Sequence, residues 1–148
     1  LDHDLGVRQA ERAGAVFVGE FRGGTHDLVL DGVLGFGLSG PVREPWDRVL
    51  GSVGRVCPDA VIVSIDVPSG WPFAPSEDTD THTLLRPHAI VSLSAPKTCL
   101  HLIRAMGGDR PAHYLAGPFM SATTLARHGL SSNPRLPPGS LYVRSLYE

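Results

Sequence analysis

The sequence predicts an α/β fold built around a mostly parallel sheet. Six apolar runs of strand length occur along the 148 residues, and segments with helical periodicity separate most of them. The runs do not alternate strictly between apolar and polar residues, which is typical of strands buried on both faces. Strands that alternate with helices indicate βαβ units. The predicted strands are Ala15–Val18, Leu28–Leu34, Val61–Ile65, Ala89–Leu93, His113–Leu115 and Leu141–Val143.

Four segments between these runs have apolar residues at helical spacing. Pro41 ahead of the second segment and Gly107 after the third are boundary signals of the kind that flank helices. The stretch Trp71–Arg86, rich in Pro, Ser, Asp and Thr, is predicted to be a loop over the crevice side of the sheet. The predicted helices are Asp4–Ala13, Glu44–Val56, Lys97–Met106 and Ser121–His128.

The composition indicates one globular domain over residues 1–148. Hydrophobic residues make up 42% of the chain, and 13 basic against 15 acidic residues give a net charge of −2. This balance gives no electrostatic reason to expect nucleic acid or an anionic membrane as a partner. The two cysteines, Cys57 and Cys99, lack the spacing of a metal site, so reduced thiols and an intracellular location are expected. Because the chain starts at Leu1 without Met or a targeting signal, we expect it to be truncated at its amino terminus.

Two strand ends carry the most specific signals. The runs at Leu28–Leu30 and Val61–Val63 each lead to an acidic residue, Asp31 and Asp66, and then to a loop of small residues. An open parallel sheet builds its ligand crevice at the carboxyl ends of its strands, so we expect both aspartates at one crevice.

Each charged residue near these ends has more than one interpretation. Asp66 before a Pro-Ser-Gly turn could only hydrogen-bond backbone amides, or it could give and take a proton. Asp31, inside an apolar run, needs either a cation or a hydrogen-bond network. Lys97, at the start of a predicted helix, either contacts a phosphate or is solvated on the surface.

Four stretches of the chain resemble, in order and spacing, the YjeF N-terminal domain family. The best-known members of that family are the NAD(P)H-hydrate epimerases, also called apolipoprotein A-I-binding proteins. The resemblance runs from about Asp27 to the end of the chain, and Ser-Ile-Asp-Val-Pro-Ser-Gly is its most specific part. The matching stretches are Asp31–Pro45, Ser64–Trp71, Ser94–Lys97 and His113–Phe119.

The resemblance implies a Rossmann-like three-layer α/β/α sandwich, usually dimeric. It implies an isomerase that interconverts the R and S forms of hydrated NADH or NADPH in nicotinamide nucleotide repair. By the same resemblance Asp66 binds the substrate and is the catalytic acid/base, and Asp31 and Ser69 help to hold a potassium ion. The implied substrate-binding loop comprises Gly35, Phe36, Gly37, Leu38, Ser39, Gly40 and Pro41.

The family's Asn-Asn-Gly-Gly-Asp phosphate loop is not present in the chain. We therefore expect that loop, with the first strand and helices, upstream of Leu1, and little activity from this chain alone. The intracellular location expected from the cysteines is the cytoplasm or the mitochondrion. The resemblance also implies a homodimer and, as a further partner, apolipoprotein A-I. The alternative function is a non-catalytic module for dimerisation or RNA-related binding, as in related decapping-enhancer domains.

Overall fold

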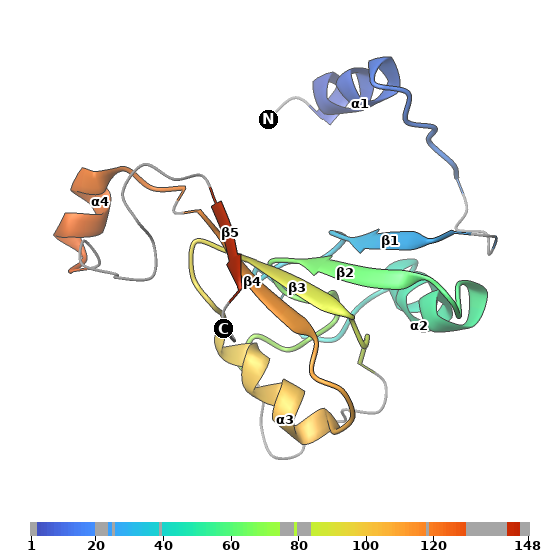
Figure 1. Cartoon of the computed structure of the whole chain (residues 1–148). Helices are drawn as coiled ribbons and strands as arrows, with labels where there is room; N and C mark the ends of the chain where they lie inside the picture. The colour runs from blue at the N-terminus through green and yellow to red at the C-terminus, as the bar shows by residue number, and fades with distance from the viewer. Residues whose placement is uncertain are drawn as a thin grey trace.

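Five strands form one sheet in the order β1-β2-β3-β4-β5 (Figure 1). The computed structural model describes residues 3–19, 24, 26–38, 40–74, 79, 84–117, 119–129 and 142–145. Strands β1 to β4 are parallel, and β5 runs antiparallel to β4. The mostly parallel α/β architecture predicted from the sequence is therefore confirmed. The strands are β1 (Leu28–Asp31), β2 (Val61–Ile65), β3 (Ala89–Leu93), β4 (Ala112–Gly117) and β5 (Tyr142–Ser145).

Helices connect two of the three parallel strand pairs. Helix α2 lies between β1 and β2, and a 3₁₀ turn followed by α3 lies between β3 and β4. Helix α4 begins after Ser121, whose Oγ accepts the N–H of Thr124 at 3.2 Å and so caps the helix. In the described part of the chain, no helix is long and apolar enough to cross a bilayer. The helices are α1 (His3–Arg12), α2 (Trp46–Val56), η1 (Thr98–His101), α3 (Leu102–Met106) and α4 (Ala122–Arg127).

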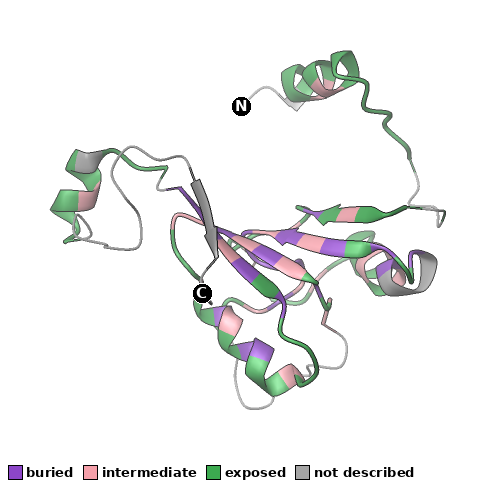
Figure 2. Cartoon of the chain, viewed as in Figure 1, coloured by how far each residue is buried: buried purple, intermediate pink, exposed green. Residues whose placement is uncertain are grey.

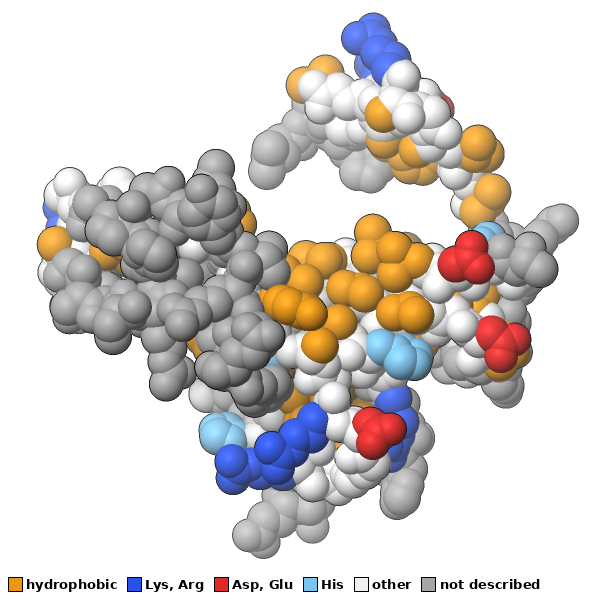
Figure 3. Space-filling model, viewed as in Figure 1, with side chains coloured by type: hydrophobic (Ala, Val, Ile, Leu, Met, Phe, Trp, Pro, Cys, Tyr) orange, Lys and Arg blue, Asp and Glu red, His pale blue; other side chains and the backbone are white. Residues whose placement is uncertain are grey.

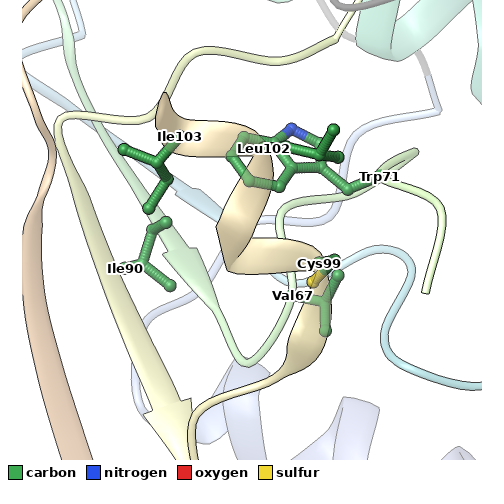
Figure 4. Close-up of a cluster of buried hydrophobic side chains, with 6 residues drawn as sticks. All are labelled: Val67, Trp71, Ile90, Cys99, Leu102 and Ile103. Carbon is green, nitrogen blue, oxygen red and sulfur yellow. The ribbon is translucent and has the colours of Figure 1, made fainter. Parts of the chain in front are cut away.

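The hydrophobic core lies between one face of the sheet and the segment η1-α3 (Figures 2 and 4). Ile90 of β3 is fully buried, and Leu102 and Ile103 of α3 belong to the same cluster. Trp71 joins this cluster, and its indole N–H donates to the carbonyl of Leu85 at 2.9 Å. This bond ties the two ends of the predicted loop to the core. Each such side chain contributes roughly 2 kcal/mol by leaving water.

The opposite face of the sheet is apolar and open in the described part of the chain. Leu28 and Leu30 of β1 are 52% and 64% exposed, and Val61 of β2 is 46% exposed. The register places Leu28 beside Val61 and Leu30 beside Val63, so these side chains share one face. Hydrophobic side chains gather in the middle of the view in Figure 3. Helices α1 and α4 stand away from the sheet in Figure 1, so a second helical layer is not formed by the described elements.

Three predicted elements differ from the structure. The predicted strand Ala15–Val18 is wrong: the segment is coil, and Val16 is 85% exposed. An apolar run becomes a strand only beside a partner, and the described chain offers this one no neighbouring strand. The run predicted as Leu28–Leu34 ends as a strand at Asp31, because the chain turns toward Ser69. The predicted helix Lys97–Met106 begins instead as a 3₁₀ turn at Thr98.

Candidate functional site

Asp31 ends β1, and its side chain is buried against the turn that follows β2. The register of the two strands sets Asp31 beside Ser64, and Ser64 Oγ donates to Asp31 Oδ2 at 2.8 Å. The amide of Ser69 donates to the same oxygen at 2.8 Å. The other oxygen, Oδ1, is buried and has no hydrogen-bond partner in the described part of the chain. Such an atom carries a desolvation cost that a bound cation would offset.

Ser69 and Gly70 join the two strand ends to each other and to α2. The amide of Leu34 donates to Ser69 Oγ at 2.8 Å, and the Ser69 hydroxyl donates back to the Leu34 carbonyl at 3.2 Å. Gly70 has a φ of 87°, in the left-handed region that favours glycine. A Cβ at Gly70 would lie 3.4 Å from Val42 Cγ2 and 3.6 Å from Leu50 Cδ1. The turn therefore requires glycine for both its conformation and its close packing.

Asp66 follows β2 directly and lies at the carboxyl ends of the parallel strands. Its φ of 70° is unusual for a residue with a side chain, although aspartate tolerates this region better than most. The backbone is fixed by the Asp66 amide, which donates to the Val91 carbonyl at 2.8 Å. Oδ1 of Asp66 accepts the Leu93 amide at 3.2 Å and Lys97 Nζ at 2.6 Å. A strained residue held by several bonds is a common feature of functional sites.

The predicted substrate loop lies beside the second oxygen of Asp66. A Cβ at Gly35 would be 4.0 Å from Asp66 Oδ2, so the loop begins next to this atom. The Leu38 amide donates to the Gly35 carbonyl at 3.2 Å, which makes the first part of the loop a turn. Phe36 is 64% exposed, and Gly37, Gly40 and Pro41 are also exposed. Of the predicted loop residues, Ser39 lies outside the described part of the chain.

The structure assigns Lys97 a role that the sequence did not suggest. Its ammonium group pairs with Asp66, and the two side chains are 16% and 11% exposed. It therefore takes neither of the roles considered from the sequence, because its donors are used by the protein itself. No signal in the sequence links Lys97 to Asp66, which lies 31 residues earlier in the chain.

The site therefore has two parts at the ends of neighbouring strands. Asp31 and Ser69 form the first part, with a buried carboxylate oxygen that lacks a partner. Asp66 and Lys97 form the second, next to the loop that begins at Gly35. Within the described residues, no three His, Cys, Asp or Glu side chains lie together as metal ligands. A cation at Asp31 would thus depend on hydroxyl and carbonyl oxygens for its other contacts.

Comparison with known proteins places these residues in context. Residues 4–99 match the family described as YjeF-related protein N-terminus. The chain is 35% identical over 106 residues to an NAD(P)H-hydrate epimerase of Caenorhabditis briggsae, covering 70% of this chain and 41% of that protein. It is 33% identical over 119 residues to an NAD(P)H-hydrate epimerase of Cryptococcus neoformans, covering 73% of this chain and 45% of that protein.

A solved structure has the same fold. The crystal structure of yeast ynu0, YNL200c, superposes with a TM-score of 0.60 at 27% sequence identity. The superposition covers 81% of this chain and 46% of the yeast chain. The chain thus spans less than half the length of the relatives it matches.

Proposed function

Since the chain belongs to the family of YjeF-related protein N-termini, we propose that it interconverts the R and S hydrates of NADH or NADPH. The observation that carries the proposal is the position of Asp66. Its carboxylate is fixed at the end of β2, and Oδ2 faces the start of the glycine-rich loop at Gly35. The relatives named NAD(P)H-hydrate epimerase support the substrate.

The chemistry of the hydrate suits a single carboxyl group. A hydrated nicotinamide carries a hydroxyl on a ring carbon, and loss and return of water inverts that carbon. The departing oxygen needs a proton, and the returning water gives one up, so protons balance without a co-reactant. One carboxyl group held on a rigid strand end can serve both steps. Asp66 is the described residue that meets this requirement beside the loop.

The loop at Gly35–Pro41 is the proposed binding segment for the dinucleotide. Glycines leave the backbone free to approach a pyrophosphate closely, and Gly40 has a φ of 79° that other residues rarely adopt. The exposed ring of Phe36 offers an apolar surface to a ring of the ligand.

Potassium at Asp31 is the proposed cofactor. The fit rests on Asp31 Oδ1, a buried carboxylate oxygen without a described partner. Ser69 Oγ accepts one hydrogen bond, from Leu34, and so keeps a lone pair for the ion. A bound ion would neutralise the buried charge and hold the two strand-end loops together. Homodimerisation, binding of apolipoprotein A-I and the cellular compartment stay predictions.

The direct test is the rate of epimerisation with and without the Asp66 carboxylate. The intact protein is incubated with one purified epimer of hydrated NADH, and the other epimer is separated and quantified over time. We expect the wild type to accelerate the exchange and Asp66→Asn to lose about 10² to 10⁴ of the rate, the range for removal of a general acid/base.

Asp59→Asn is the matched control, because Asp59 is exposed in the turn before β2. It should retain the wild-type rate. Full activity in Asp66→Asn would remove the proposed role of this residue. Tight binding of RNA by the wild type, with no binding of the hydrate, would favour the non-catalytic alternative.

A further inference from the structure

Lys97 is the one lysine of a chain that otherwise uses arginine for its basic residues. Of thirteen basic residues, twelve are arginine. Lys97 lies just before η1, after the end of β3. Its side chain is only 16% exposed, which is unusual for lysine. A largely buried, paired lysine in an arginine-rich chain suits a position that needs an ammonium group.

Three hydrogen bonds use all the donors of this ammonium group. Lys97 Nζ donates to Asp66 Oδ1 at 2.6 Å, to the Leu93 carbonyl at 2.8 Å and to the Ala95 carbonyl at 2.9 Å. An ammonium group directs three N–H bonds away from one nitrogen, as a tripod. A guanidinium group is planar and spreads its donors over three nitrogens, so it cannot reproduce this arrangement.

The two carboxylate oxygens of Asp66 therefore have different hydrogen-bond partners. Oδ1 accepts both Lys97 Nζ and the Leu93 amide. Oδ2 has no hydrogen-bond partner within the described residues, and it lies 4.0 Å from the Cβ position of Gly35. Rotation of the carboxylate would break two bonds, one of them to a charged donor. The oxygen that faces the loop is therefore fixed.

The same ammonium group also fixes the backbone around Ser94. Ser94 has a φ of 63°, in the left-handed region, and the two carbonyls that Lys97 binds belong to the residues on either side of it. Asp66 is the other described residue with a side chain and a positive φ. Lys97 thus joins two strained residues at the ends of β2 and β3.

We propose that Lys97 is a positioning residue, which holds Asp66 so that only Oδ2 exchanges protons with the hydrated nicotinamide. This inference rests on the proposed epimerase function. Lys97 itself does not contact the substrate, because its three donors are occupied. Its absence would allow Asp66 to rotate and would leave a buried carboxylate without its counter-charge.

The kinetic test compares Lys97→Met and Lys97→Arg with wild type in the intact protein. Lys97→Met keeps the length of the side chain and removes the charge and all three donors. We expect kcat to fall about a hundredfold, the size expected for a misplaced catalytic group. KM should change little, because binding of the hydrate does not use Lys97. Lys97→Arg should recover less than a tenth of the lost rate, because it restores charge without the tripod.

The control is Arg86→Met, which removes another cation that binds backbone carbonyls. Arg86 donates to the carbonyls of Met106 and Gly107 at 3.1 and 3.4 Å, at the end of α3. This variant should lose stability and keep the wild-type kcat. Unchanged kcat in Lys97→Met would overturn the inference. Full recovery in Lys97→Arg would also overturn it, since charge alone would then suffice.

A second measurement does not depend on whether the Lys97 variants fold. Protein labelled with ¹⁵N in its lysine side chains gives an ammonium signal for Lys97 by NMR, assigned through its proximity to Asp66. In wild type its protons should exchange slowly with water, and Asp66→Asn should shift the signal. Fast exchange in wild type, as for a solvated lysine, would refute the tripod.

The outcomes separate the two proposals. If wild type does not epimerise the hydrate, the proposed function fails and the role of Lys97 in it fails as well. If wild type is active and Lys97→Met is equally active, only the positioning role fails.

Discussion

The substitution Asp31→Asn tests whether the buried carboxylate holds potassium, because its effect on stability should change sign with the ion. Asparagine has the shape of aspartate, and its carbonyl oxygen can accept the two bonds that Asp31 Oδ2 accepts from Ser64 and Ser69. The change therefore removes one charge at a buried position and leaves the local hydrogen bonds in place.

Without potassium, the variant should be the more stable protein. Asp31 is 5% exposed, and its Oδ1 has no partner in the described part of the chain. An uncompensated buried charge costs more than an uncompensated amide, by roughly 1–2 kcal/mol. In choline chloride we thus expect Asp31→Asn to melt a few degrees above wild type, at roughly 3 °C per kcal/mol for a chain of this length.

With potassium, wild type should become the more stable protein. At a concentration of about 100 times Kd, an ion that binds only the folded state adds about 2.7 kcal/mol, or roughly 8 °C in Tm. Asparagine lacks the charge that attracts the ion, so the Tm of the variant should stay nearly constant. The difference between the two proteins then reverses between choline and potassium at equal ionic strength.

The assay is thermal unfolding followed by circular dichroism in choline, sodium and potassium chloride. Asp59→Asn serves as the control, since Asp59 is exposed in the turn before β2, at the other end of that strand from Asp66 and Ser69. An equal response to potassium in wild type and Asp31→Asn would show that the Asp31 carboxylate does not hold the ion. A wild type that responds equally to sodium and potassium would show a cation site without the proposed preference.

Two further predictions concern stability. Gly70→Ala should destabilise the protein by about 1–2 kcal/mol, because φ is 87° and the new Cβ would lie 3.4 Å from Val42 Cγ2. Urea unfolding measures this loss of stability. Gly37→Ala gives the comparison, since a Cβ at Gly37 would have no heavy atom within 4 Å. Burial lowers the pKa of His113 below its ordinary value of 6.5. His113 of the unfolded chain then binds a proton at a higher pH than His113 of the folded chain. The free energy of unfolding should therefore be highest above pH 6.5 and decrease as the pH falls toward the lower pKa of the folded state. His113→Gln should flatten this slope in unfolding measured from pH 8 to pH 5; an unchanged slope would contradict the assignment to His113.

The sequence predicted the central parallel strands well, because a strand that is buried on both faces consists mainly of apolar residues. Val61–Ile65 and Ala89–Leu93 are strands with the predicted bounds. Each is flanked on both sides by a partner strand, so the run of apolar residues and the structural element coincide. The predicted strand Ala15–Val18 failed for the converse reason, since composition says nothing about whether a partner strand is present.

The sequence also located the two aspartates but not their environment. Strand ends are visible as an apolar run followed by an acidic residue and a turn, and that pattern placed Asp31 and Asp66 correctly. The partner of Asp66 is 31 residues away along the chain, and no local pattern connects the two. The pairing of Asp66 with Lys97 arises only when β2 and β3 lie side by side. Long-range contacts of this kind need the folded structure.

The decisive measurement is the rate at which the intact protein converts one epimer of hydrated NADH into the other. We expect a rate well above the spontaneous one in wild type, with the acceleration lost in an Asp66→Asn variant whose folding is confirmed by circular dichroism. A wild type that does not exceed the spontaneous rate, or an Asp66→Asn variant that is as fast as wild type, would contradict the proposed role of Asp66.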